Sequence, residues 1–297
     1  MTVDTIAHMP ERRSPTLRRR RLSAELRRLR AAKGLSVIEV AERANWSEAK
    51  QRWIEDAQWV RPNPRDVQDL LDIYEVTDTR AREELLRWAR EGRQKGWWHA
   101  YREMLSERYS TYIGLEAEAA EVLTFELAVI PGLAQTEAYA RALIQGGPAE
   151  IDDAEIEKRV EVRAERQQIL TADDPVRLQM VIDEAALRRP VGGPEVMREQ
   201  FERLIELANL PHVLVQILPY AIGPHPGTGG PFTILSFEGD PDAVYVPTIA
   251  GQLLIEEDKD VKRYERVFRR LIGKALSPEA TIAMLATEVA TPNRPPN

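Results

Sequence analysis

The apolar positions in the first part of the chain recur with the spacing of an amphipathic helix. Leu17, Leu22, Leu26 and Leu29 lie five, four and three residues apart in TLRRRRLSAELRRLRAAKG, with arginine between them. This spacing gathers the leucines on one side of a helix, and Gly34 is suited to end it. We therefore predict a first helix with one apolar and one strongly basic side.

Two shorter helices are predicted next, joined by a tight turn. Ser36 and Glu39 form a capping-box pair at the start of VIEVAER, and Ser47 is placed to cap the helix in WSEAKQRWIEDA. Asn45 tolerates the left-handed conformation that such a turn requires, and Ala41 is small enough for the two helices to pack closely. The pattern is typical of a helix-turn-helix.

A fourth helix is predicted to start at Asn63-Pro64, because proline suits the first helical position. A fifth helix, TDTRAREELLRWAREGRQKG, has a partly apolar face and ends at Gly96. The buried face of the fourth helix is predicted to consist of Val67, Leu70, Leu71 and Tyr74.

The pattern changes in the second half of the chain. The aromatic-rich segment 96–144 and VEVRAERQQIL are interpreted as helical, and so are FERLIELANL, KDVKRYERVFRRLIGKAL and PEATIAMLATEVA. Short β-branched runs bounded by Pro, Gly and Asp indicate strands in VRLQMVIDEAAL, HVLVQILPY, PFTILSF and AVYVPTIAGQLLIEE. This order predicts an α+β domain with a small, mainly antiparallel sheet and helices packed on one face.

The length of 297 residues favours two domains. The fold class is therefore a mainly α helix-turn-helix domain followed by an α+β domain. We divide the chain into a flexible N-terminal arm (1–15), a helix-turn-helix domain (16–77), a linking helix (78–95), a regulatory or interaction domain (96–290) and a disordered tail (291–297).

The charge is unevenly distributed along the chain. Residues 11–33 contain ten Lys or Arg and two acidic residues, a local charge of +8, which leaves −15 for the rest of a chain whose net charge is −7. A basic segment ahead of an acidic body favours phosphate contacts with double-stranded DNA. The alternative is a solvated helix face with surplus arginine.

Several classes of protein are disfavoured by what the sequence lacks. Cysteine is absent and the four histidines are far apart, so we expect neither disulfides nor a metal site. No apolar run has the length of a membrane span or of a signal-peptide core. We therefore expect a cytoplasmic protein that does not enter a membrane.

Residues 17–76 resemble the XRE-type helix-turn-helix domain of bacterial regulators. The resemblance is carried by LRRLRAAKGLSVIEVAERANWS, a following recognition helix and a loop with the pattern P-x-P. It implies that the WSEAKQRW helix lies in the major groove of DNA while the basic first helix grips phosphates. The implied DNA-contacting residues are Arg18, Arg19, Arg20, Arg27, Ser36, Ser47, Glu48, Ala49, Lys50, Arg52 and Trp53.

The recognition helix departs from the family pattern at two positions. Gln51 stands where the family usually has an aliphatic residue, and a buried Gln without a partner costs on the order of 1–3 kcal/mol. Arg52 stands in place of a small polar residue and suits a bidentate contact with guanine. Glu48 opposes this, since phosphates repel a carboxylate unless it accepts a hydrogen bond from cytosine. A rotated helix remains open, because a second apolar stripe consists of Trp46, Ala49, Trp53 and Ala57.

The second half of the chain resembles the C-terminal domain of unknown function in actinobacterial regulators, a group that includes WhiJ-like and antitoxin-like proteins. The resemblance implies a transcriptional regulator, expected to be a repressor and a homo-oligomer, with a small partner protein encoded nearby. The shared segments, in order, are GWW (96–98), YIGLEAEA (112–119), IPGLAQTEAYARAL (130–143), DEAALRRPVGGPEVMREQ (183–200) and HPGTGGPF (225–232).

No residue is assigned a catalytic, cofactor-binding or metal-binding role, and no enzymatic activity is expected. HPGTGGPF lacks the Gly-Lys-Ser/Thr of a phosphate-binding loop and precedes a strand, so it is interpreted as a connecting loop or as a ligand or partner loop. The candidate ligand or partner residues are His225, Gly227, Thr228, Gly229, Gly230, Asp183, Glu184 and Arg188.

Three functions stay open on the sequence alone. The leading hypothesis is a DNA-binding repressor in which the WSEAKQRW helix reads bases; it requires Arg52 outside the core and the basic residues on the same face. The second is an antitoxin-like interaction module with weak or lost sequence-specific DNA binding. The third is an enzyme or small-molecule sensor that uses the aromatic-rich large domain.

Overall fold

The computed structural model describes residues 14–147, 151–248 and 251–290. The chain divides into two compact units between His99 and Ala100, and each is described by itself. The predicted tail and all but the last two residues of the predicted arm lie outside the described residues.

The first unit is helical, as predicted. Its elements are α1 (Pro15–Ala32), α2 (Val37–Arg43), α3 (Glu48–Glu55), α4 (Pro64–Ile73), α5 (Thr79–Glu91) and a short 3-10 helix (Trp97–Tyr101) that continues past the boundary between the units. The predicted starts of α2, α3 and α4 are confirmed. Ser36 and Glu39 form a capping box, the Ser47 hydroxyl accepts from the Lys50 amide, and the Asn63 side chain accepts from the Arg65 amide.

The helices α1 to α4 all end in the same way. After each one a residue adopts a left-handed backbone conformation, and the next amide donates back to a carbonyl in the last helical turn, the Schellman arrangement. The left-handed residues are Gly34, Asn45, Ala57 and Glu75. The predictions for Gly34 and Asn45 are confirmed, whereas Ala57, with φ 55°, ends the recognition helix without the glycine that favours this conformation.

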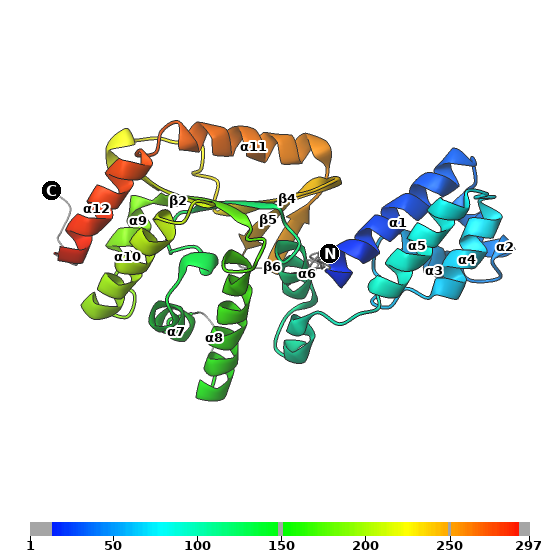
Figure 1. Cartoon of the computed structure of the whole chain (residues 1–297), viewed down its shortest axis with the longest axis horizontal. Helices are drawn as coiled ribbons and strands as arrows, with labels where there is room; N and C mark the ends of the chain where they lie inside the picture. The colour runs from blue at the N-terminus through cyan, green and yellow to red at the C-terminus, as the bar shows by residue number, and fades with distance from the viewer. Residues whose placement is uncertain (1–13, 148–150, 249–250, 291–297) are drawn as a thin grey trace, which may run out of the picture. The chain divides into compact units, whose positions relative to one another are not determined.

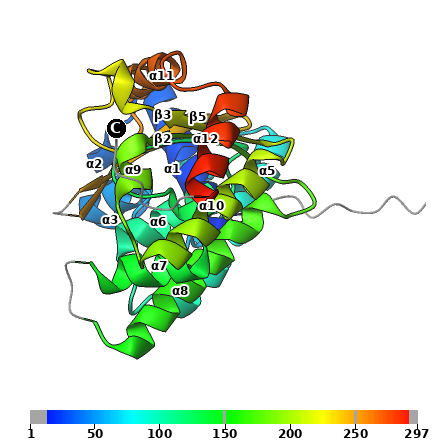
Figure 2. The same ribbon diagram turned by 90° about the vertical axis from the view of Figure 1, so that its left-hand side faces the viewer.

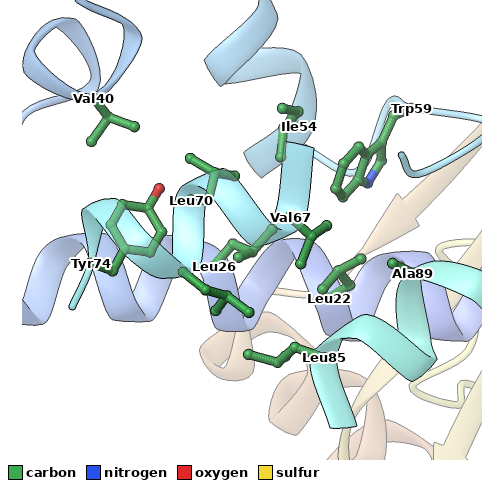
Figure 3. Packing of buried hydrophobic residues seen from close by; sticks show 11 residues of the cluster. Leu22, Leu26, Val40, Ile54, Trp59, Val67, Leu70, Tyr74, Leu85 and Ala89 are labelled. Atoms are coloured by element: carbon green, nitrogen blue, oxygen red, sulfur yellow. The ribbon is translucent and has the colours of Figure 1, made fainter. Parts of the chain in front are cut away.

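One apolar core joins all five α-helices of the first unit (Figure 3). The predicted face of α4 is confirmed, since Val67, Leu70, Leu71 and Tyr74 are all buried. Trp59, from the loop after α3, lies fully buried and donates from Nε1 to the Ser23 hydroxyl at 2.9 Å. Leu85 and Ala89 of α5 belong to this core, so the helix that we predicted to link the domains packs within the first unit.

The second unit contains α6 (Glu107–Glu116), α7 (Glu137–Gln145), α8 (Asp153–Gln167), α9 (Glu184–Arg188), α10 (Pro194–Ala208), α11 (Asp258–Ile272) and α12 (Pro278–Ala290). Three short 3-10 helices connect them, at Gly132–Ala134, Gln168–Leu170 and Tyr220–Ile222. The strands are β1 (Glu121–Glu126), β2 (Arg177–Asp183), β3 (Val213–Leu218), β4 (Phe232–Phe237), β5 (Asp240–Thr248) and β6 (Gly251–Ile255).

The strands form one six-stranded sheet in the order β3-β2-β1-β4-β5-β6. The predicted α+β class fits this unit, but the prediction of a small, mainly antiparallel sheet is wrong. β1, β2 and β3 are parallel, while β4, β5 and β6 continue the sheet antiparallel from β1. The prediction missed β1, whose residues EVLTFE lie in a segment interpreted as helical, and β1 is the strand that joins the parallel part of the sheet to the antiparallel part.

Helices cover both faces of the sheet, which corrects the prediction of one covered face. Figure 1 shows α11 along one face and α7, α8 and α10 below the other, and Figure 2 shows the same layers from the side. Parallel strands require crossover connections, and helices in these connections lie on one face when the crossovers share one hand. The helix α11 follows the antiparallel strands and covers the opposite face.

The sheet separates two environments by the alternation of side chains along β1. Phe125 faces the apolar core beneath α11, which also contains Phe232, Ile234, Val244 and Phe268. The neighbouring positions Val122, Thr124 and Glu126 face the other side, toward α6 and α8. The side that faces these two helices is therefore the more polar one.

We expect Ala57→Gly to stabilise the first unit by about 1 kcal/mol, because glycine adopts the left-handed conformation without the steric cost that Ala57 bears. All six tryptophans lie between residues 46 and 98, so urea unfolding followed by tryptophan fluorescence reports on this unit.

The matched control is Ala24→Gly at an exposed position inside α1, which should instead lower the stability by about 1 kcal/mol. Equal destabilisation by both substitutions would contradict the role assigned to Ala57.

Candidate nucleic-acid interface

The helix α3 presents one polar face outward and packs the other into the first unit. Gln51, Ile54 and Glu55 are buried, whereas Ala49, Arg52 and Trp53 are exposed, with 40% of Trp53 accessible. The alternative apolar stripe through Trp46, Ala49, Trp53 and Ala57 is therefore not the packed face. The residues available to a groove are those that the position in a helix-turn-helix implies.

The buried carboxylate of Glu55 fixes this orientation. Arg30 of α1 donates to both of its oxygens, from Nε at 2.7 Å and from Nη2 at 2.9 Å. Gln51 Nε2 donates to the same carboxylate at 2.6 Å and to the Tyr74 hydroxyl at 3.2 Å. Hydrogen bonding to Glu55 raises the pKa of Arg30, which keeps the guanidinium charged. The network ties α3 to α1 and α4.

The unusual Gln51 is thus explained in part. Its Nε2 has two acceptors, but its Oε1 is buried with no hydrogen-bond partner among the described residues. An aliphatic residue here would remove the hydrogen bonds that Gln51 donates to Glu55 and Tyr74, while Gln51 keeps one unsatisfied acceptor, at a cost of about 1–3 kcal/mol. The polar residue is therefore part of the anchoring network of α3.

The exposed side chains of α3 interact with their own neighbours. Arg52 donates from Nε to Glu48 at 3.0 Å and forms a further short contact through Nη2. Lys50 pairs with Asp66 of α4 at 2.8 Å and lies 4.0 Å above the Trp46 ring. Arg52 has 61% of its side chain accessible, so this surface pair costs little to open.

The predicted phosphate contacts on α1 have other partners. Arg18 pairs with Glu91 at 3.2 Å, and Arg19 donates to the carbonyls of Val60 and Gly92. Burial lowers the pKa of Arg20 to about 10. Arg18 and Arg19 therefore join α1 to the end of α5 and to the loop after α3.

The remaining predicted residues lie nearer to α3 or cap helices. Arg27 is half exposed and pairs with Asp56, immediately after α3, at 2.5 Å. Ser36 and Ser47 use their hydroxyls as caps. Each hydroxyl also stands at the start of a helix, where amides and the helix dipole favour a phosphate.

Sequence reasoning missed three exposed cations in the helix pair and the segment that follows it. Arg43 ends α2, Arg61 lies in the loop after α3, and Arg65 is next to the Asp66 that pairs with Lys50. All three are exposed, and no ion pair involves them among the described residues. In the sequence, the only indication of these residues was that they end or follow the helices α2 and α3. The prediction instead favoured the first helix, because it contains many arginines.

Comparison with protein-family models assigns both parts of the chain. Residues 109–287 match a domain of unknown function, DUF5753, and this match covers more than half of the chain. The chain belongs to the DUF5753 family. Residues 21–86 match a helix-turn-helix domain, and the match extends into α5. No curated protein and no solved structure matches the chain. A helix-turn-helix ahead of a large DUF5753 domain indicates a DNA-binding regulator.

The candidate ligand residues of the DUF5753 domain fall into two linked groups. His225 Nε2 lies 3.6 Å from Asp183 Oδ2, and His225 Nδ1 accepts from the Gly227 amide at 3.2 Å. A side chain at Gly227 would collide with Phe125, so this glycine is required for packing. Thr228 and Gly229 are exposed, and Gly230 adopts a left-handed conformation.

Glu184 and Arg188 satisfy each other inside the DUF5753 domain. Arg188 donates to Glu184 at 2.8 Å and to Glu288 of α12 at 2.8 Å, while Glu184 also accepts from the Tyr220 amide. These contacts hold α9 against α12 and leave little of either charge for a ligand. Their proposed role in binding a partner stays a prediction.

Two further findings concern the part of the chain that the structure describes. It holds no group of three or more His, Asp or Glu placed to bind a metal ion. None of its helices is both long enough and apolar enough to cross a membrane.

We expect Glu55→Ala to destabilise the first unit by about 3 kcal/mol, because it removes the carboxylate that accepts from the partly buried Arg30 and from the Gln51 amide. Urea unfolding followed by tryptophan fluorescence measures this change.

Glu25→Ala is the matched control, since its pair with Arg28 is exposed and should contribute less than about 1 kcal/mol. If both substitutions cost the same small amount, Glu55 does not anchor the recognition helix.

Proposed function

We propose that the protein is a transcriptional repressor of the XRE type that binds double-stranded DNA through α3. The observation that carries the proposal is the outward face of α3, with Ala49, Arg52 and Trp53 accessible on a helix whose other face is locked by Glu55. A rigidly held helix with an exposed polar face is what major-groove recognition requires.

The charges around this face support phosphate binding. Arg43, Arg61 and Arg65 are exposed and have no ion pair in the described structure, so they can contact phosphates without breaking an internal bond. Arg18 and Arg19 would first have to leave Glu91 and the carbonyls that they bind. We therefore assign the principal phosphate contacts to the three exposed arginines, together with Arg27 near the end of α3.

The pairing of Arg52 with Glu48 favours a second candidate function. A guanidinium held by its own helix is less available to guanine, and a carboxylate in the groove is repelled by phosphates. This is the observation that supports an antitoxin-like interaction module with weak or lost sequence-specific DNA binding. The two functions differ in whether Arg52 and Glu48 separate on DNA.

The remaining parts of the proposal concern partners and assembly. We propose a cytoplasmic homo-oligomer, since helix-turn-helix proteins commonly bind paired half-sites as dimers. The DUF5753 domain acts as a non-catalytic regulatory domain, of the WhiJ-like kind, that receives a ligand or a small partner protein encoded nearby. A second copy would supply the second recognition helix.

The first test measures binding of the full chain to DNA from its own promoter as a function of salt. Arg61→Ala and Arg65→Ala should each lower the slope of log affinity against log salt by about one, and weaken binding equally on all sequences. Arg87→Ala, an exposed arginine on α5 that pairs with Glu84, is the control and should leave the slope unchanged.

The second test separates the two candidate functions. If α3 reads bases, Arg52→Ala should reduce the preference for the specific site by about 1–3 kcal/mol while binding to unrelated DNA persists. Equal affinity of the unmodified protein for specific and unrelated DNA would favour the interaction module. No retention of any promoter fragment at low salt would remove the DNA-binding proposal altogether.

A further inference from the structure

A cavity lies on the polar side of the sheet in the DUF5753 domain. Its volume is about 190 Å³, and its walls come from β1, β4, β5, α6, α8 and the segment that precedes α7. A second cavity of about 370 Å³ adjoins it, and Tyr109 and Arg163 line both. Together they fall within the range of roughly 300–1,000 Å³ that small-molecule sites occupy.

One buried ion pair in the wall is complete. Arg166 of α8 donates to both oxygens of Glu116 at 2.7 Å, and also to the Tyr109 hydroxyl at 2.6 Å. The Tyr112 hydroxyl donates to Glu116 at 2.5 Å. All hydrogen-bonding groups of this pair that the structure describes are matched to each other, so it forms a neutral, rigid wall and has no need of a ligand.

Two other charged groups in the same cavity are not matched to each other. Glu126, at the end of β1, lines the cavity and has no hydrogen bond or ion pair among the described residues. Arg163 of α8 donates a short hydrogen bond to Gln135 and also hydrogen-bonds with Tyr109, which leaves further guanidinium N–H groups out of five. A carboxylate and a guanidinium therefore face one cavity without touching.

The environment makes both charges costly. Burial raises the pKa of the Glu126 carboxyl to about 7, an effect that Arg163 partly offsets. Burial likewise lowers the pKa of Arg163. Charged groups with shifted pKa values in a cavity are candidates for ligand binding, because a ligand can supply the partner that the protein lacks. The pair Arg166–Glu116 shows how the same wall satisfies a charge when no ligand is needed.

Aromatic rings complete the wall. Tyr112 stacks on Tyr245 of β5 with ring centroids 3.9 Å apart, and Tyr109 stacks on Tyr112 at 6.0 Å. A ligand between Glu126 and Arg163 would thus lie beside a flat, apolar surface with hydroxyls at its edge. Such a mixture of aromatic walls and a few polar groups is typical of metabolite sites.

We propose that this cavity binds a small zwitterionic molecule of the amino-acid or dipeptide class, with its ammonium group at Glu126 and its carboxylate at Arg163. An ammonium donates to a carboxylate, and a guanidinium donates to a carboxylate in two-pronged fashion, so a zwitterion satisfies both groups at once. The inference gives the regulatory role proposed for the DUF5753 domain a ligand class, and in that sense rests on it.

The test uses the full chain and a panel of free α-amino acids and dipeptides at millimolar concentration. Calorimetric unfolding should show that a member of the panel stabilises the second unit, because a bound ligand stabilises by mass action. Succinate and phosphate, which lack the amine, and putrescine, which lacks the carboxylate, should give no comparable shift. No stabilisation by any amino acid or dipeptide overturns the proposal, and equal stabilisation by succinate or putrescine overturns the zwitterion assignment.

Variants locate the site. By isothermal titration, Glu126→Gln and Arg163→Gln should each weaken binding by about 10- to 100-fold, the loss expected for a charge-assisted hydrogen bond. Arg163→Lys keeps the charge and should retain part of the affinity, so the role of the charge can still be tested if Arg163→Gln does not fold. Glu121→Gln, at the other end of β1, is the matched control and should leave affinity unchanged. Unchanged affinity in Glu126→Gln overturns the proposal.

The pH dependence provides a readout that a merely structural role would not give. The titratable or charged groups that act on Glu126 are Arg163 of α8, Tyr139 of α7 and Tyr245 of β5, and neither tyrosine is ionised near neutral pH because burial raises the pKa of both. Affinity should therefore rise as the pH increases through about 7 and Glu126 ionises, and Glu126→Gln should abolish this rise. A pH-independent affinity overturns the proposal.

DNA binding is measured on the same samples, so that failure of this inference is distinguishable from failure of the proposed function. Promoter binding without any stabilisation by the panel removes the cavity proposal alone. Stabilisation by the panel without promoter binding leaves the cavity proposal standing and removes the repressor.

Discussion

The orientation of the recognition helix α3 within the first unit depends on the hydrogen bonds that the Glu55 carboxylate accepts. This carboxylate lies inside the first unit at the end of α3, where it accepts two hydrogen bonds from Arg30 and one from Gln51. A buried charge is tolerated only when its partners are placed accurately, so the network permits one rotation of α3 and disfavours the others. The exposed positions of Ala49, Arg52 and Trp53 follow from that single orientation.

In the second unit, the alternation of side chains along β1 decides which residues are buried in the apolar core and which face the cavity. Along β1, Phe125 enters the apolar core under α11, while Glu126 faces the helices on the other side. A parallel neighbour on one side and an antiparallel neighbour on the other make β1 the centre of the sheet. A charge at this position is therefore partly removed from bulk water, and α8 and the segment before α7 contribute to its environment.

Much of the first unit could be predicted because its signals are local. A capping box, a proline at the first helical position and a residue able to adopt a left-handed turn each act over three or four residues. Ser36, Asn45 and Pro64 were therefore placed correctly. The sheet was harder to predict from the sequence. The segment EVLTFE is short, alternates polar and apolar residues and ends in a glutamate, and it pairs with strands more than fifty residues away along the chain. Only those distant partners make it the central strand.

For the candidate sites too, the sequence showed which residues are charged but not which partners they have. The density of arginine in α1 suggested phosphate contacts, but Arg18 and Arg19 turn toward Glu91 and Gly92, partners that no local pattern reveals. From the sequence, Gln51 was a departure from the family pattern with no visible partner. The structure shows that it donates to Glu55 and Tyr74, and that Arg30 binds the same Glu55 carboxylate.

The sequence by itself determined that a capped helix-turn-helix precedes an α+β domain, since periodicity and caps are properties of neighbouring residues. Tertiary structure alone decided which charges are neutralised inside the protein and which remain available. Electrostatic energy depends on distance and burial in space, and the charged partners of Arg18, Glu55 and Glu126 lie far from them along the chain.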